Sequence, residues 1–97
     1  MPTLLSETDI KASLSRIPEW RSRDNSISRR FEFADFAASM GFVNTVAALA
    51  EEADHHPDID IRWNKVLLRL STHSAGGLTA LDFALAEKID AAANGSQ

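Results

Sequence analysis

Apolar and polar positions in the first third of the chain predict a short helix followed by two strands. Ser6 and Asp9 are typical of a helix start, and Pro18 ends a helix that we expect to run to about Arg16. The Asp-Asn-Ser run at residues 24–26 is a turn signal, so the segments on either side of it are predicted to pair as a hairpin. The second strand shows the alternation of a half-buried strand, with Ile27, Arg29, Phe31 and Phe33 at the alternating positions.

An apolar stripe at three- and four-residue spacing predicts an amphipathic helix in the middle of the chain. Asp35 is a suitable N-cap, and the stripe fades in the acidic residues 51–54. Gly41 within it is either a small cost to helix stability or a point of close packing. The positions that we expect to be buried are Phe36, Met40, Val43, Ala47 and Ala50.

A second hairpin is predicted around a two-residue turn at Asn64 and Lys65. With this turn, apolar residues of one strand face apolar residues of the other, and Asp60 faces Arg69 as an opposite-charge pair. A shift of one residue would destroy the match, which favours this register. The predicted apolar pairs are Trp63 with Val66, Ile61 with Leu68, and Ile59 with Leu70.

The chain ends in a predicted third helix. Gly76 and Gly77 interrupt the preceding segment, and Thr79 is expected to cap a helix through about Ala93, followed by a frayed tail at about residues 94–97. Its expected buried positions are Leu81, Ala84, Leu85 and Ile89. The order helix, strand, strand, helix, strand, strand, helix predicts a single α+β domain over residues 1–97. We expect a four-stranded antiparallel sheet with the three helices packed on one face.

Composition narrows the function classes mainly by exclusion. The 97 residues carry a net charge of −4, which argues against a dedicated nucleic-acid-binding protein. The chain has no apolar run of the roughly 20 residues that cross a bilayer, and no secretory signal pattern. The absence of cysteine excludes disulfides, thiolate metal sites and a cysteine nucleophile. We therefore expect a cytoplasmic protein.

The three histidines of the chain lie around the second predicted hairpin. The predicted pairing, if continued, sets His56 opposite His73 beside His55, although Pro57 should end regular pairing near there. Asp82, in the first turn of the last helix, could reach the same patch. Imidazoles can act as general acid and general base near neutral pH, and a carboxylate can orient one of them. The patch therefore suits proton-transfer chemistry such as elimination of water or isomerisation.

Other interpretations of the same residues stay open. A histidine at a strand end is usually structural or solvated, and Asp82 stands where it can complete a capping box with Thr79. Three histidines and an aspartate are also a possible zinc or iron ligand set. Adjacent histidines such as His55 and His56 rarely bind one ion together, so we expect no metal site.

Several residues at characteristic spacings carry a family resemblance that spans nearly the whole chain. In the second half they are Glu51, His55-His56-Pro57, Trp63, His73 and Asp82. Upstream, Trp20 precedes a hairpin with Phe31-Glu32-Phe33, and Asp35-Phe36 and Gly41-Phe42 follow. With these residues the chain resembles the pterin-4a-carbinolamine dehydratases.

The resemblance implies a reaction and a site. Members of this family convert 4a-hydroxytetrahydropterin to quinonoid dihydropterin and water, which recycles the pterin cofactor of aromatic amino acid hydroxylases, and they use no metal or cofactor of their own. By this resemblance His55 and His73 would be the acid and the base, in either order. His56 would bind the pterin and support turnover as a further catalytic residue, and Asp82 would orient a histidine or the substrate. Further positions that match pterin-lining residues of the family are Asp54, Pro57, Ser71, Thr72 and Ser74.

The resemblance also bears on partners. It implies a homodimer or homotetramer and a functional link to a phenylalanine hydroxylase. Residues 58–60 (Asp-Ile-Asp) stand where animal members carry a Glu-Trp pair, a departure that could alter pterin stacking. Some relatives act as dimerisation cofactors or assembly factors, so a non-catalytic binding module is the alternative. Retention of all three histidines and Asp82 favours the enzyme.

Overall fold

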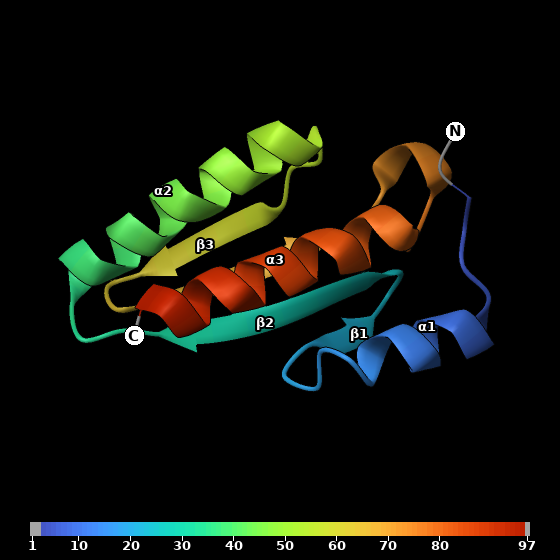
Figure 1. The fold of residues 1–97 in the computed structure, drawn as a ribbon, viewed down its shortest axis with the longest axis horizontal. Coiled ribbons are helices and arrows are strands. Elements are labelled where there is room, and N and C mark those ends of the chain that lie inside the picture. Colours follow the sequence, from blue (N-terminus) through green and yellow to red (C-terminus); the bar gives the residue numbers. More distant parts are fainter. Residues whose placement is uncertain (1–2, 97) are drawn as a thin grey trace.

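A four-stranded antiparallel sheet in the order β1-β2-β4-β3 forms the base of the fold. The structure is a computed structural model that describes residues 3–96, with side chains through Asn94. All three helices lie on one face of the sheet (Figure 1), which confirms the predicted α+β architecture and element order. The strands are β1 (Arg21–Arg23), β2 (Ser26–Glu32), β3 (Asp58–Arg62) and β4 (Lys65–Leu70). The helices are α1 (Glu7–Leu14), α2 (Phe36–Ala53) and α3 (Ala80–Ser96), with a 3₁₀ turn η1 (His73–Ala75) after β4.

The hydrophobic core lies between the two central strands and the helices α2 and α3. Alternate residues of a strand point to the same face, so every second residue of β2 and β4 enters the core. These include Ile27 and Phe31 on β2, and Val66, Leu68 and Leu70 on β4, all buried. The intervening residues of both strands project from the opposite face, which the helices leave open (Figure 1).

The predicted helix caps and the first hairpin are confirmed. The backbone amide of Asp9 donates to Ser6 Oγ at 3.1 Å, and that of Ala38 donates to Asp35 Oδ1 at 2.8 Å. Asp24 and Asn25 both have positive φ, at 50° and 65°, as the type I′ turn of a two-residue hairpin requires. Helix α1 ends at Leu14, slightly before the expected position.

The buried stripe predicted for the middle helix is partly wrong. In α2, Phe36 is 51% exposed and Ala47 is also exposed, although Ala50 is buried as expected. The observed buried positions of α2 are Ser39, Phe42, Val46 and Ala50. Helix α2 faces the sheet through Phe42 because this ring packs against Phe31 and Phe33, with centroid distances of 4.7 and 4.9 Å. Gly41 is exposed and has no close neighbour, so it is not a point of close packing.

The stripe predicted for the last helix is also partly wrong. Leu85 and Ile89 are buried, but Leu81 is 40% exposed and Ala84 is exposed. The buried positions of α3 instead include Asp82, Phe83, Leu85, Ala86, Ile89 and Ala93. Hydrogen bonds that hold Asp82 in the interior fix the rotation of this helix about its axis. Helix α3 continues to Ser96, beyond the expected end near Ala93, and Gln97 lies outside the described residues.

The second hairpin forms, but its register differs from the predicted one by two residues. Ile61 pairs with Val66 and Ile59 with Leu68, so that Asp58, in place of Asp60, faces Arg69. A shift of two residues keeps each side chain on its predicted face, which is why the apolar match survives.

The turn of this hairpin consists of Trp63 and Asn64. Trp63 therefore leaves the predicted apolar face and is 65% exposed, with a positive φ of 52°. The side chain of Asn64 donates to the backbone oxygen of Phe33 at 2.9 Å, and the backbone nitrogen of Phe33 donates to the Asn64 oxygen at 2.9 Å. These two bonds anchor the turn to the chain that leaves β2 and so select the observed register. Among residues 3–96, none of the helices is both long and apolar enough to cross a membrane.

Candidate active site

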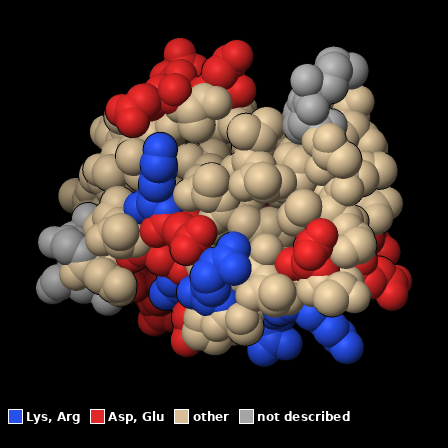
Figure 2. Space-filling view, turned by 45° about the vertical axis from the view of Figure 1, so that its right-hand side comes forward, with Lys and Arg blue, Asp and Glu red and all other residues tan. Residues whose placement is uncertain are grey.

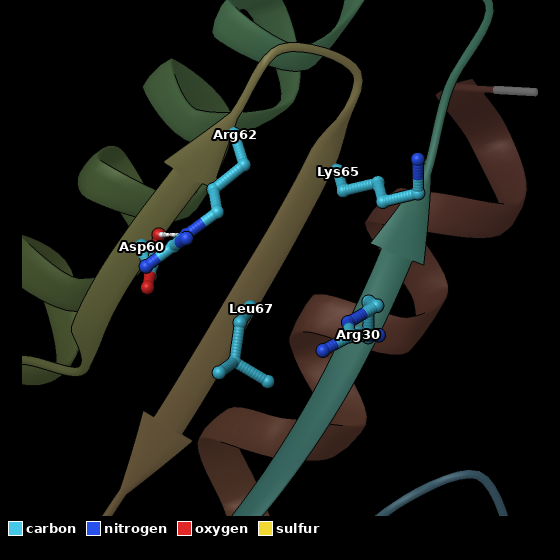
Figure 3. A pocket seen from close by; sticks show the side chains of 5 residues that line it. All are labelled: Arg30, Asp60, Arg62, Lys65 and Leu67. Atoms are coloured by element: carbon cyan, nitrogen blue, oxygen red, sulfur yellow. Dashed lines mark hydrogen bonds and ion pairs between the residues drawn. The ribbon is translucent and has the colours of Figure 1, made fainter.

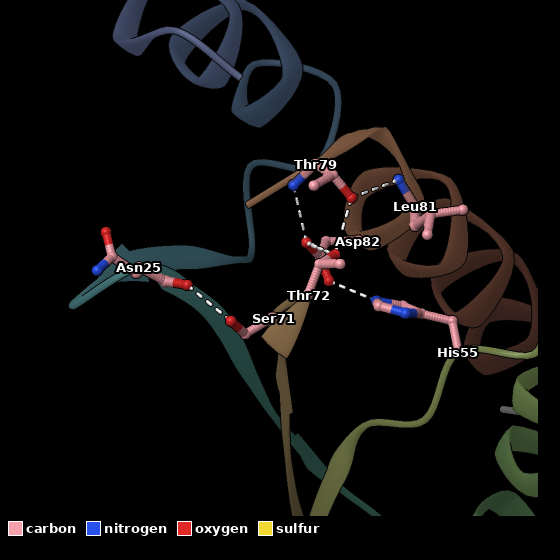
Figure 4. A network of polar contacts seen from close by, with 7 residues as sticks. All are labelled: Asn25, His55, Ser71, Thr72, Thr79, Leu81 and Asp82. Atoms are coloured by element: carbon pink, nitrogen blue, oxygen red, sulfur yellow. Dashed lines mark hydrogen bonds and ion pairs between the residues drawn. The ribbon is translucent and has the colours of Figure 1, made fainter. Parts of the chain in front are cut away.

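A buried carboxylate meets an imidazole where β4 ends and α3 begins. Asp82, in the first turn of α3, has 0% of its surface exposed. Its Oδ1 lies 2.6 Å from Nε2 of His55, a residue that is 8% exposed (Figure 4). The prediction that Asp82 reaches the histidine patch is thereby confirmed.

The second carboxylate oxygen of Asp82 is also fully engaged. Oδ2 accepts a hydrogen bond from Thr72 Oγ1 at 2.9 Å and another from the backbone nitrogen of Thr79 at 2.9 Å. The two threonine hydroxyl oxygens are 2.8 Å apart, and Thr79 Oγ1 accepts from the backbone nitrogen of Leu81 at 3.2 Å. Asp82 thus completes the capping box with Thr79 and holds His55 as well, so both predicted roles occur in one side chain.

These hydrogen bonds determine which nitrogen of His55 is available for chemistry. Asp82 accepts from Thr72 and Thr79, so it acts as a carboxylate acceptor, and Nε2 of His55 donates to it. The other ring nitrogen, Nδ1, makes no hydrogen bond within residues 3–96, where no buried side-chain polar atom lacks a partner. Nδ1 is therefore open to solvent and can accept or give a proton.

The end of α2 explains why His55 points inward. Asp54 caps the helix in the left-handed conformation, with φ 51° and ψ 44°. The backbone nitrogen of His55 then donates to the oxygen of Ala50 at 3.0 Å, and that of Asp54 donates to the oxygen of Glu51 at 3.2 Å. This reversal of the chain is typical of helix C-termini, and aspartate tolerates it better than most residues. Asp54, predicted to line a pterin site, thus has a structural role as well.

His56 has a different environment from its neighbour His55. Its side chain is exposed, and Nε2 lies 2.5 Å from Oε2 of Glu51 in the last turn of α2. Pro57, which follows, is partly buried, and β3 begins only at Asp58. The structure therefore places the two adjacent imidazoles in separate contacts, one with a buried carboxylate and one with a surface carboxylate.

The predicted pairing of His56 with His73 is wrong. The observed register, continued past Asp58, would set His56 against Ser71, because the hairpin turn lies one residue earlier than predicted. His73 begins the turn η1, is exposed, and lines a surface depression with Ser71 and Asp58. It remains close to the buried network because the preceding residue, Thr72, bonds Asp82.

The loop after η1 closes tightly on the end of β4. Thr72 forms an isolated bridge with Gly77, and its backbone nitrogen donates to the Gly77 oxygen at 2.9 Å. Gly76 has φ 80°, a conformation that glycine adopts without strain. Of the other predicted site residues, Ser71 donates to the Asn25 oxygen at 3.0 Å (Figure 4) and Ser74 is exposed in η1.

Two residues of this site were assigned no functional role in the sequence analysis. Thr79 was expected only as a helix cap, yet its hydroxyl also contacts the threonine that holds Asp82. Glu51 is one of the residues whose spacing carries the family resemblance, and the structure pairs it with His56. The spacing from Thr79 to Asp82 could have indicated the contact of Thr79 with this network. The position of Glu51 in the last helical turn before two histidines could have indicated its contact with His56.

A second depression differs from this site in its residues. A depression on the open face of the sheet is lined by Arg30, Asp60, Arg62, Lys65 and Leu67 and contains no imidazole (Figure 3). On the face that Figure 2 shows, basic and acidic side chains are interspersed. In the described part of the chain, no three His, Asp or Glu side chains are placed to hold a metal ion together.

The protein is thus an α+β protein with a buried histidine–aspartate pair. Two further histidines lie at the same end of one hairpin. The family model described as pterin 4 alpha carbinolamine dehydratase matches residues 3–92. The chain belongs to the pterin-4a-carbinolamine dehydratase family, as the sequence resemblance predicted.

Relatives of known sequence match over most of their length. A Picosynechococcus protein named "putative pterin-4-alpha-carbinolamine dehydratase" is 53% identical over 90 residues, which cover 93% of this chain and 98% of that protein. A Chloroflexus aurantiacus protein of the same name is 56% identical over 86 residues, covering 89% of this chain and 92% of that protein.

Two solved structures share the fold. A transcriptional coactivator/pterin dehydratase from Brucella melitensis matches with a TM-score of 0.88 and 37% identity, over 92% of this chain and 97% of that chain. A pterin dehydratase-like protein described as a RuBisCO assembly factor in the alpha-carboxysome matches with a TM-score of 0.63 and 28% identity. That match covers 76% of this chain and 86% of the other.

Proposed function

We propose that this protein dehydrates 4a-hydroxytetrahydropterins to quinonoid dihydropterins. The observation that carries the proposal is the contact of 2.6 Å between His55 Nε2 and the buried Asp82. A carboxylate so placed fixes the tautomer and the direction of an imidazole, which a merely structural histidine does not need. Membership of the dehydratase family supplies the substrate class.

The reaction needs one proton donor and one proton acceptor. The bond between C4a and its hydroxyl oxygen breaks while that oxygen takes up a proton and leaves as water. A proton leaves the adjacent ring nitrogen, and its electron pair forms the carbon–nitrogen double bond of the product. We assign these transfers to His55, through Nδ1, and to His73, in either order. His56 is assigned to pterin binding, together with Asp54, Pro57, Ser71, Thr72 and Ser74.

The proposal includes a cellular setting. The protein would be cytoplasmic, would form a homodimer or homotetramer, and would recycle the pterin cofactor of an aromatic amino acid hydroxylase. Size-exclusion chromatography with light scattering tests the oligomeric state. A monomer at assay concentration would contradict that part.

A rapid-mixing absorbance assay tests the activity. It follows the loss of synthetic 4a-hydroxytetrahydropterin with wild type and with the His55→Ala/His73→Ala double variant. Wild type should accelerate the loss, and the double variant should lose roughly 10²-fold or more of that acceleration. Arg62→Ala is the matched control, because Arg62 is exposed, pairs with Asp60 and lies outside the site. Circular dichroism verifies that each variant is folded.

The alternative is a non-catalytic dimerisation or assembly cofactor. The descriptions of the two solved relatives, one a transcriptional coactivator and one a RuBisCO assembly factor, support this candidate. If folded wild type fails to accelerate dehydration over buffer, the enzyme proposal is wrong. Affinity capture of a protein partner then becomes the relevant experiment.

A further inference from the structure

Four buried polar side chains form a single line of hydrogen bonds that ends at His55 (Figure 4). The line starts where the backbone nitrogen of Leu81 donates to Thr79 Oγ1 at 3.2 Å, and the hydroxyl oxygens of Thr79 and Thr72 lie 2.8 Å apart. Thr72 Oγ1 lies 2.9 Å from Oδ2 of Asp82, whose Oδ1 lies 2.6 Å from Nε2 of His55. The exposed fraction is 1% for Thr79, 4% for Thr72 and 0% for Asp82, so water has little access to the line.

The number of protons on each hydroxyl fixes the direction of these bonds. A threonine hydroxyl has one proton to donate, and an ionised carboxylate only accepts. Thr72 gives its proton to Asp82, so the proton between the two threonines belongs to Thr79. Thr79 therefore donates to Thr72, while its own oxygen accepts from the backbone of Leu81. Every bond of the line points toward Asp82.

This direction gives the hydroxyl of Thr79 two separable contacts. As an acceptor it caps α3 through the backbone nitrogen of Leu81, a contact that concerns stability. As a donor it holds the hydroxyl of Thr72 in the direction that reaches Asp82. It also polarises that hydroxyl, because hydrogen bonds in series strengthen one another in a low-dielectric interior. The second contact joins the residue before α3 to the segment after β4 and caps no helix.

The orientation of the Asp82 carboxylate depends on the donated proton. The backbone nitrogen of Thr79 also bonds Oδ2, but it belongs to the same helix start as Asp82. Thr72 is the one side chain within residues 3–94 that bonds Oδ2. Loss of its bond would let the carboxylate turn about the Cβ–Cγ bond and move Oδ1 away from Nε2 of His55.

Resting on the proposed function, we infer that Thr79 is a positioning residue for the dehydration and acts through Thr72 and Asp82. Its donated proton holds Asp82 so that Nε2 of His55 carries the ring proton and Nδ1 stays free for the substrate. Thr79 is too deeply buried to touch the substrate, so its effect on the rate is indirect.

The experiment compares Thr79→Val, which removes the hydroxyl but keeps the shape of the side chain, with Thr79→Ser, which keeps the hydroxyl. In the rapid-mixing assay the valine variant should lower kcat by roughly three- to tenfold, the scale of one hydrogen bond, with KM unchanged. The serine variant should retain the wild-type kcat. Asp35→Ala is the matched control and should also retain it, because it removes a helix cap at the opposite end of α2 from His55.

A second readout separates this inference from the proposed function, because it needs no turnover. Nuclear magnetic resonance of protein with labelled histidine ring nitrogens reports the tautomer of His55 at a pH where its ring is neutral. Wild type should show Nε2 protonated and Nδ1 unprotonated, and Thr79→Val should move both shifts toward the average of the two tautomers. Thr79→Ser and Asp35→Ala should leave them unchanged. If the valine variant does not fold, Thr79→Ala replaces it with the same expectations.

The two readouts assign each outcome. A tautomer shift in the valine variant, absent from the serine variant and the control, supports the positioning role even if wild type proves unable to dehydrate the pterin. That inability would contradict the proposed function alone. Unchanged histidine shifts or an unchanged kcat in a folded valine variant would overturn the positioning role and leave Thr79 as a helix cap. So would a loss of rate that Thr79→Ser or Asp35→Ala shares, and in each of these cases the dehydratase stands.

Discussion

Asp82 uses its two oxygens for different purposes, one toward Nε2 of His55 at 2.6 Å and one toward the hydroxyl of Thr72 at 2.9 Å. The same carboxylate caps α3 through the backbone of Thr79. One buried side chain therefore couples the start of a helix, the end of a strand and the orientation of an imidazole. Substitutions at these contacts should therefore show which of them support the stability of the fold and which support the activity.

Asp82→Asn should lower kcat by roughly 10- to 100-fold, a part of what general acid–base catalysis contributes. An amide can present a donor to His55 Nε2, which would disturb the tautomer that leaves Nδ1 available. The single-turnover rate in the rapid-mixing assay measures this loss. A variant that folds and keeps the wild-type rate would show that Asp82 is only a helix cap.

Thr79→Val should destabilise the protein by about 1–3 kcal/mol, because it leaves the amide of Leu81 and the hydroxyl of Thr72 short of a partner. Thr79→Ser keeps the hydroxyl and should recover most of the loss. Urea denaturation followed by circular dichroism gives both values. Equal stability of the valine and serine variants would refute the role of the hydroxyl.

Glu51→Gln should change the free energy of unfolding by less than about 1 kcal/mol, because its pair with His56 is on the surface. If His56 binds the pterin, as proposed, loss of the carboxylate that positions it should raise KM and leave kcat near the wild-type value. Steady-state kinetics beside thermal denaturation test this. A fall in kcat with unchanged KM would instead place His56 in the proton transfers.

Trp63→Gly should stabilise the protein by about 1 kcal/mol, since glycine adopts the observed φ of 52° without the strain of a side chain. The exposed indole has little burial to lose. Trp63→Ala removes the same ring but keeps the strain, so it should give no such gain. The urea midpoints of the three proteins decide the matter.

The sequence predicted the elements, their order and the caps of α1 and α2, because those depend on local patterns. It failed on the register of β3 and β4, because a period of two residues cannot distinguish shifts of two. The contact that chose between them, Asn64 with Phe33, joins residues far apart in the chain. The helix stripes failed because α2 and α3 are rich in alanine and offer more than one apolar face. Packing of Phe42 on the sheet chose between those faces in α2.

For the site, the sequence located the residues but only part of their geometry. A cluster at one end of the second hairpin followed from its strands, and Asp82 was correctly expected to join it. That His55 would be the histidine in contact with Asp82 depends on the left-handed cap at Asp54. Sequence patterns did not reveal that conformation, since aspartate is equally common in ordinary turns.

The cap at Asp54 also makes this short segment intolerant of changes in length. His55 and His56 are adjacent in sequence, yet the side chain of His55 is buried and that of His56 is exposed. The direction of each imidazole ring depends on how many residues separate it from the end of α2. Deleting one residue before the two histidines would therefore bring His56 into the position of His55. Since the two side chains are chemically the same, the length of the segment between α2 and the histidines decides which of them is buried.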